Sequence, residues 1–136
     1  MNFHLKITAS ARSFFDGECE SLIVPTEAGM YGILAMHESA VIGIRVGAMK
    51  YRLPGERDHT TVVVGEGFAR VSNNTVTVLV DSVELPEEID ANRAREAKAR
   101  ALEHMQQRKS LHEYYQGKLA MTRAMTRLKV KEGKYL

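Results

Sequence analysis

The sequence lacks the features that mark a disulfide-stabilised or membrane-spanning chain. Cys19 is the single cysteine among 136 residues, so neither an intrachain disulfide nor a cysteine-based zinc cluster can form within the chain. No run approaches the roughly 20 apolar residues that a helix needs to cross a bilayer. Residues 1–6 contain no basic segment leading into an apolar stretch, so no signal peptide is expected. Any association with a membrane is therefore expected to depend on a partner.

Groupings that would indicate catalysis or metal binding are also missing from the sequence. No histidine pair has the spacing of metal ligands with a carboxylate nearby. Gly65 and Gly67 are not followed by the helix and the Lys-Ser/Thr of a phosphate-binding Walker loop. No Ser/His/Asp set or pair of carboxylates stands out. We therefore expect no catalytic residues, no metal, and a protein that is not an enzyme.

The small net charge of +2 conceals an uneven distribution along the chain. Residues 1–86 hold 7 Lys and Arg against 10 Asp and Glu, a net charge of −3, whereas residues 87–136 hold 12 against 7, a net charge of +5. The two parts therefore differ in electrostatic character, and the second is the one that would attract an anion or an acidic surface.

Residues 1–86 have the composition and turn spacing of an all-β domain. Residues 21–24 and 61–64 are short runs rich in β-branched side chains. The clearest hairpin is predicted at residues 68–80, where the pair Asn73-Asn74 tolerates the positive φ of a tight turn. Turn signals recur roughly every 8–12 residues, which is typical of a sandwich rather than of βαβ units. The expected fold of this part is a flattened antiparallel β-sandwich or barrel.

A helical segment is predicted to begin where the composition changes at residues 85–88. Pro86 suits the first turn of a helix, and the two glutamates after it suit the positive end of the helix dipole. From Ile89 onward alanine recurs, and no glycine or proline occurs before Gly117. A capping box at Ser110 predicts a second helix, from Leu111 to about Lys129. Residues 87–136 are therefore expected to form an antiparallel helical hairpin.

The faces of the two expected helices differ in the size of their apolar side chains. The first helix presents a narrow face of mostly small residues, namely Ala94, Ala97, Ala101 and Met105. The second helix presents a face of larger residues, namely Tyr114, Met121, Met125 and Leu128. At about 25 cal/mol per Å² an alanine methyl contributes much less than a leucine side chain. The packed hairpin is therefore expected to be only marginally stable, which suits a conformational switch and equally a plain surface appendage.

Four short motifs, in order along nearly the whole chain, resemble those of the epsilon subunit of bacterial F-type ATP synthases. Residues 29–37 read GMYGILAMH and resemble the family's G-x-x-G-x-L-P-x-H, and residues 65–68 resemble its G-G-F turn. Residues 89–94 read IDANRA and match the family's I/L-D-x-x-R-A, and residues 123–128 resemble its R-A-x-x-R-L. Ala35 and Ser39 stand where the family usually has proline, which puts the stiffness of that loop in doubt.

The resemblance implies a non-catalytic rotor subunit of the central stalk that couples proton flow to ATP synthesis. It implies that the β-sandwich docks on the gamma subunit and on the membrane-embedded c-ring. The hairpin would lie folded or extend toward the alpha/beta catalytic hexamer and restrain ATP hydrolysis. The protein would then be peripheral at the cytoplasmic face of the bacterial cell membrane, as part of the F1 sector.

In some bacterial members of this family the folded hairpin binds ATP, and the resemblance implies such a site here. The corresponding positions, all with the family's residue type, are Glu84, Ile89, Asp90, Arg93, Ala94, Arg100, Arg123 and Arg127. The chemistry is consistent, because four guanidiniums that face one another repel unless an anion such as a triphosphate lies between them. Asp90 and Glu84 could accept hydrogen bonds from the nucleoside, and the small Ala94 would leave room for the base. Nothing in the sequence requires a metal with the nucleotide.

Alternatives remain at this stage. The arginines can instead be solvated side chains that form weak surface pairs. A second function is nucleic-acid binding by the basic tail, although acidic residues interrupt its positive charge. A third is an enzyme built on the sandwich, which lacks any convergent site. Two interpretations remain for Met30, Met36 and Met49: these side chains pack in the core, or they lie on a face that docks on a partner.

Overall fold

The computed structural model describes residues 1–107 and 111–133, and it divides the chain into two compact units, Met1–Glu84 and Leu85–Leu136. The first unit holds ten strands: β1 (Phe3–Ala9), β2 (Arg12–Cys19), β3 (Ser21–Thr26), β4 (Gly29–Leu34), β5 (Ala40–Ile44), β6 (Gly47–Arg52), β7 (Thr60–Val64), β8 (Gly67–Ser72), β9 (Thr75–Val80) and β10 (Val83–Glu84). The second unit holds a 3₁₀ turn, η1 (Pro86–Glu88), and two helices, α1 (Ala91–Gln107) and α2 (Leu111–Lys131). The expected order, all-β and then a helical hairpin, is confirmed.

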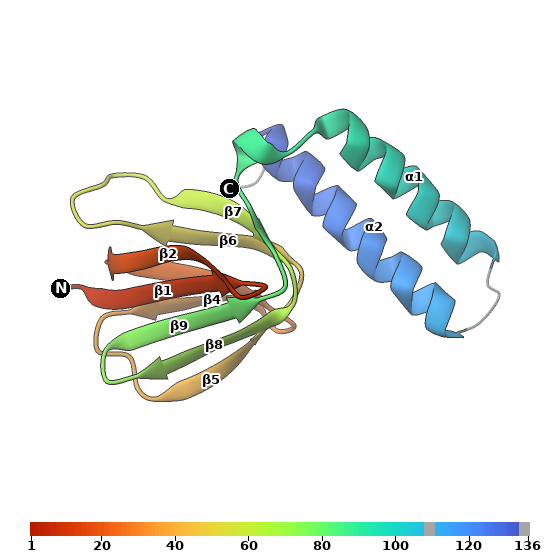
Figure 1. The fold of residues 1–136 in the computed structure, drawn as a ribbon. Coiled ribbons are helices and arrows are strands. Elements are labelled where there is room, and N and C mark those ends of the chain that lie inside the picture. Colours follow the sequence, from red (N-terminus) through yellow and green to blue (C-terminus); the bar gives the residue numbers. More distant parts are fainter. Residues whose placement is uncertain (108–110, 134–136) are drawn as a thin grey trace. The chain divides into compact units, whose positions relative to one another are not determined.

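The strands form two five-stranded sheets that face each other (Figure 1). Their orders are β2-β1-β9-β8-β5 and β10-β7-β6-β3-β4. All pairs are antiparallel except β1 with β9, which run parallel because these strands come from opposite ends of the unit rather than from one hairpin. The sandwich is therefore mostly antiparallel, as expected, with one parallel pair that the local sequence did not indicate.

The core lies between the two sheets and is built from alternating side chains. In β9, Val76, Val78 and Val80 are buried, whereas Leu79 between them is exposed. This alternation confirms the two-faced strand predicted from the sequence. Met49 in β6 is fully buried and belongs to the core, whereas Met30 is 46% and Met36 67% exposed. The open question about the methionines is thus settled for Met49 in favour of core packing.

Two positions show how the sequence fixes the β8–β9 hairpin. Asn73 and Asn74 have φ of 51° and 56°, the positive values that a two-residue hairpin turn requires, which confirms the predicted turn. At the start of β8, a Cβ on Gly67 would lie only 1.9 Å from the carbonyl oxygen of Leu79 on the neighbouring strand. The packing of the sheet therefore requires a glycine at this open end of the hairpin.

The second unit is an antiparallel pair of helices lying side by side (Figure 1). The sequence predicts that Pro86 lies in the first turn of the long helix, and this is wrong. Pro86 instead opens η1, in which the N–H of Ile89 donates to the carbonyl of Pro86 at 3.2 Å. The α-helix starts only at Ala91, because Asp90 caps it. The capping box predicted at Ser110 lies outside the described residues.

Candidate functional site

Asp90 holds the N-terminus of α1 through its side chain. Its Oδ1 accepts hydrogen bonds from the backbone N–H groups of Asn92 at 2.9 Å and Arg93 at 3.2 Å. Its carbonyl also accepts the first helical hydrogen bond, from the N–H of Ala94 at 3.0 Å. These bonds satisfy donors that the first turn of a helix leaves without partners. A residue that the sequence suggested as a nucleoside contact is therefore also the N-cap that positions the first turn.

The two helices meet through small residues. Ala94, Ala101 and Ala124 are 3%, 5% and 0% exposed, and Gly117 is also buried. Ala97 and Met105 complete the face of α1 at intermediate exposure, as do Tyr114, Met121, Met125 and Leu128 on α2. The predicted alanine face is confirmed as the packed one. Ala94 lies on this packed face, where a small side chain is needed for close approach of the helices.

One side of the helix pair is closed by polar contacts. Arg95 near the start of α1 forms an ion pair with Glu132, just beyond the end of α2, with Nη2 and Oε1 3.7 Å apart. Lys131 Nζ donates to the carbonyl oxygen of Pro86 at 3.3 Å. Arg95 Nη1 also donates to Asn92 Oδ1 at 3.1 Å. We call the side of the pair that carries Arg95 and Glu132 the ion-pair flank.

The four arginines singled out from the sequence lie on the other side of the same helix pair. At 3.6 residues per turn, about 100° per residue, Arg93 and Arg100 lie on the edge of the Ala94–Ala101 face opposite to Arg95. By the same periodicity Arg123 and Arg127 lie on the edge of the Ala124 face opposite to Glu132. Since Arg95 and Glu132 meet on the ion-pair flank, the four arginines share the opposite side, which we call the arginine flank.

The antiparallel register also brings the arginines into two pairs. Two contacts indicate this register: the ion pair between Arg95 and Glu132, and the close approach of Gly117 to the backbone of Ala101. Between these contacts Arg100 falls near the level of Arg123, and Arg93 falls near that of Arg127. Within the described residues, Arg93, Arg100 and Arg123 form no ion pair. Arg93 and Arg100 are exposed, while the two arginines of α2 are half-buried.

The remaining two members of the suggested set lie at the start of the second unit and at the end of the first. Ile89 is 5% exposed and directly precedes the cap at Asp90. Glu84 ends β10 and is paired with Val63 of β7, so it belongs to the sandwich unit. The second unit by itself thus brings together seven of the suggested residues around one end and one flank of the hairpin: Ile89, Asp90, Arg93, Ala94, Arg100, Arg123 and Arg127.

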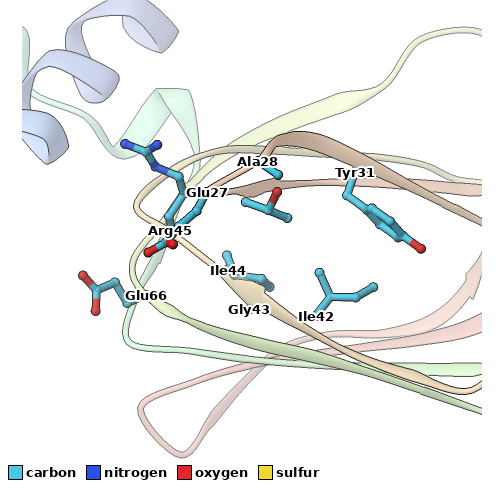
Figure 2. A pocket seen from close by; sticks show the side chains of 9 residues that line it. Glu27, Ala28, Tyr31, Ile42, Gly43, Ile44, Arg45 and Glu66 are labelled. Carbon is cyan, nitrogen blue, oxygen red and sulfur yellow. The ribbon is translucent and has the colours of Figure 1, made fainter.

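The sandwich carries a second candidate surface, along the outer edges of β4 and β5. Each of these strands ends its sheet, and an open pocket of about 490 Å³ lies between them. Figure 2 shows Tyr31 and Ile42 toward one end of this pocket and Arg45 and Glu66 toward the other. Apolar side chains are exposed nearby, with Leu34 at 62%, Met36 at 67% and Val41 at 73%. The sequence pointed to Met36 alone of these three.

Hydrogen bonds order the loop between β4 and β5. Tyr31 Oη and His37 Nε2 are 2.8 Å apart, and His37 Nδ1 donates to the carbonyl of Glu38 at 2.7 Å. The N–H of Met36, whose φ is +63°, donates to Asn74 Oδ1 at 2.7 Å. The loop that lacks the family prolines at Ala35 and Ser39 is therefore held by side-chain hydrogen bonds instead.

Other groups that could carry chemistry have structural explanations. Cys19 is fully buried, and its Sγ donates to the carbonyls of Ser21 and Arg52 at 3.1 and 3.3 Å. Burial raises the pKa of this thiol, which opposes formation of the nucleophilic thiolate. No group of three or more potential ligands that could hold a metal occurs in the described part of the chain. None of its described helices is long and apolar enough to cross a membrane.

Comparison with known proteins assigns both units to one family. Residues 2–86 match the model of the ATP synthase delta/epsilon chain β-sandwich domain, and residues 87–132 match that of its long α-helix domain. The ATP synthase epsilon chain of Ruminiclostridium cellulolyticum is 41% identical over 93% of this chain and 92% of its own length. That of Caldanaerobacter subterraneus is 37% identical over 94% and 92%.

Two solved structures share the fold of both units. A chain of the mitochondrial ATP synthase of Euglena gracilis matches 99% of this chain, and 82% of its own length, with a TM-score of 0.82 and 21% identity. A chain from the central stalk and c-ring of the Tetrahymena thermophila mitochondrial ATP synthase matches 94%, and 95% of its own length, with a TM-score of 0.73 and 16% identity. At these identities the likeness concerns the fold.

Proposed function

Since the chain belongs to the delta/epsilon family of ATP synthase subunits, we propose that it is a rotor subunit of the central stalk that restrains ATP hydrolysis through its helical hairpin. Membership of this family makes it an accessory subunit rather than a catalytic one. The observation that carries the proposal is that both units match, in order, over nearly the full length of bacterial epsilon chains.

The sandwich is the unit that docks on the gamma subunit and the c-ring. The exposed apolar side chains of Leu34, Met36 and Val41 support this assignment, because a patch of large apolar residues on a hydrogen-bonded loop and two sheet edges is typical of a protein contact. Docking there attaches the protein to the cytoplasmic face of the bacterial membrane as part of the F1 sector.

The hairpin is the regulatory unit, and ATP is its ligand in the packed state. The positive charge that the arginines concentrate on this flank attracts a polyphosphate, whose oxygens match guanidinium donors bidentately. The second oxygen of Asp90 is available to a nucleoside while the first caps the helix. ATP at ten times its Kd would stabilise the packed hairpin by about 1.4 kcal/mol. When unpacked, the helices extend toward the alpha/beta hexamer and restrain hydrolysis.

Affinity purification from native membranes tests the assignment to the rotor. Tagged protein is expected to recover the gamma, c, alpha and beta subunits. Met36→Asp should weaken recovery at least about fivefold, because it places a charge in an apolar contact. Arg57→Asp, on an exposed loop, is the control and should leave recovery unchanged. Recovery of none of these subunits by the wild-type chain would refute the proposal.

A further inference from the structure

The two helices approach each other closely at Gly117. It lies in the interior of α2 and is buried. A Cβ at this position would lie 2.9 Å from Cγ of Met105 and 3.3 Å from the carbonyl oxygen of Ala101. The second of these atoms belongs to the backbone of α1, which cannot rotate away as a flexible side-chain end can. A side chain at position 117 would therefore require the backbone of α1 to move away by a few tenths of an ångström at least.

Glycine is also a poor choice for α2 as an isolated helix. Among ordinary residues it is the weakest former of helix interiors, since it loses the most backbone freedom on ordering. The same residue therefore favours the packed hairpin, by allowing close contact, and disfavours an α2 that stands alone. Both effects shift the balance between the two states in the same direction.

We propose that Gly117 sets the balance between the packed and the separated hairpin. The rest of the interface cannot compensate for a change there, because its central residues are alanines that bury little apolar area: Ala94, Ala101 and Ala124. One added methyl both widens the closest contact and strengthens α2 as a separate helix.

The contact at Gly117 also determines how the arginine flank is assembled. This packing contact holds the register in which Arg100 lies near the level of Arg123. Separation of the helices removes that arrangement, so a ligand held by both helices binds only the packed state. By linkage, the apparent affinity of such a ligand falls by the same factor as the population of the packed state. This last step rests on the proposed function, whereas the packing step does not.

The test is a distance measurement in the full chain. Spin labels on Glu96→Cys and Lys129→Cys, both exposed, report the separation of α1 and α2 by double electron–electron resonance, while the fully buried Cys19 stays unlabelled. Gly117→Ala should shift part of the distribution to longer distances, and Gly117→Leu, a good helix former with a larger side chain, should shift most of it. Gln116→Ala and Gln116→Leu add the same groups at the exposed neighbouring position and should leave the distance unchanged.

Circular dichroism and ATP titration of the same variants separate the possible failures. Helix content should not fall in the Gly117 variants, and ATP should bind about fivefold more weakly to Gly117→Ala and over tenfold more weakly to Gly117→Leu. Unchanged distances between α1 and α2 in both Gly117 variants would overturn the inference. The same shift of distances in the Gln116 variants as in the Gly117 variants would also overturn it. If the helices separate as expected in the Gly117 variants but the wild-type chain does not bind ATP, the inference is supported and ATP is removed from the proposed function.

Discussion

At the scale of a single residue, Asp90 caps α1 and is proposed to contact the nucleotide. One oxygen of its carboxylate caps α1, and the family resemblance also assigns the residue to a nucleotide site. The sequence motif identified the position but not the cap, because the predicted helix was started too early, at residues 85–88. The missed signal was present in the sequence: aspartate directly before an alanine-rich run is a strong N-cap pattern.

Substitutions at Asp90 can separate its two roles. Asp90→Ala should lower the stability of the hairpin by about 1 kcal/mol, whereas Asp90→Ser should retain most of it, because serine is a good N-cap. Serine has no second oxygen, however, so Asp90→Ser should still bind ATP more weakly if the carboxylate contacts the nucleoside. Circular dichroism on heating and ATP titration measure the two effects. Equal ATP affinity of Asp90→Ser and the wild type would show that Asp90 only caps the helix.

Cys19 makes the stability of the sandwich depend on pH. Burial raises the pKa of its thiol, so the unfolded chain loses the thiol proton at a lower pH than the folded chain does. The folded state then binds more protons, and its stability falls as the pH rises above about 8.5. Cys19→Ala should be less stable than the wild type at pH 7, and the difference should shrink toward pH 10. Urea unfolding at several pH values measures it; a constant difference would contradict the assignment.

At the scale of elements, the β8–β9 hairpin was predictable in detail because its turn is local. Two adjacent asparagines between alternating strands indicate both the turn and its positive φ values. The parallel pairing of β1 with β9 was not predictable, since it joins strands from opposite ends of the unit. Likewise, the sharing of one flank by four arginines depends on which edges of two helix faces meet, and the Arg95–Glu132 pair supplies that information.

The two asparagines of the turn should differ in what they contribute. Asn74 Oδ1 accepts from the N–H of Met36, and Asn74 Nδ2 donates to the carbonyl of Asn2 at 2.9 Å. Asn74→Gly keeps the positive φ but loses both bonds, so the free energy of unfolding should fall by about 1–2 kcal/mol. Asn73→Gly, with the same change in the same turn, should alter it by less than about 0.5 kcal/mol. Urea titrations that give equal losses would contradict this distinction.

At the scale of the whole molecule, the sequence predicted the order of the units and the family, because four motifs carry both. The sequence could not show that Leu34 and Val41 are both exposed, since those residues lie on edge strands of different sheets. It also could not show how close the helices approach, since that depends on the backbone of Ala101 facing Gly117. We propose that the protein is a docking sandwich joined to a hairpin that an anion holds packed.

ATP titration into the full chain tests this account most directly, with two arginines of α1 as a matched pair. Arg100 lies on the arginine flank, whereas Arg95 lies on the ion-pair flank in an exposed pair with Glu132 that contributes little to stability. We expect the wild type to bind ATP saturably. Arg100→Ala should bind ATP at least about tenfold more weakly, as for loss of a charge-assisted hydrogen bond. Arg95→Ala should bind ATP with nearly unchanged affinity. No saturation at millimolar ATP, or equal losses for the two variants, would contradict it.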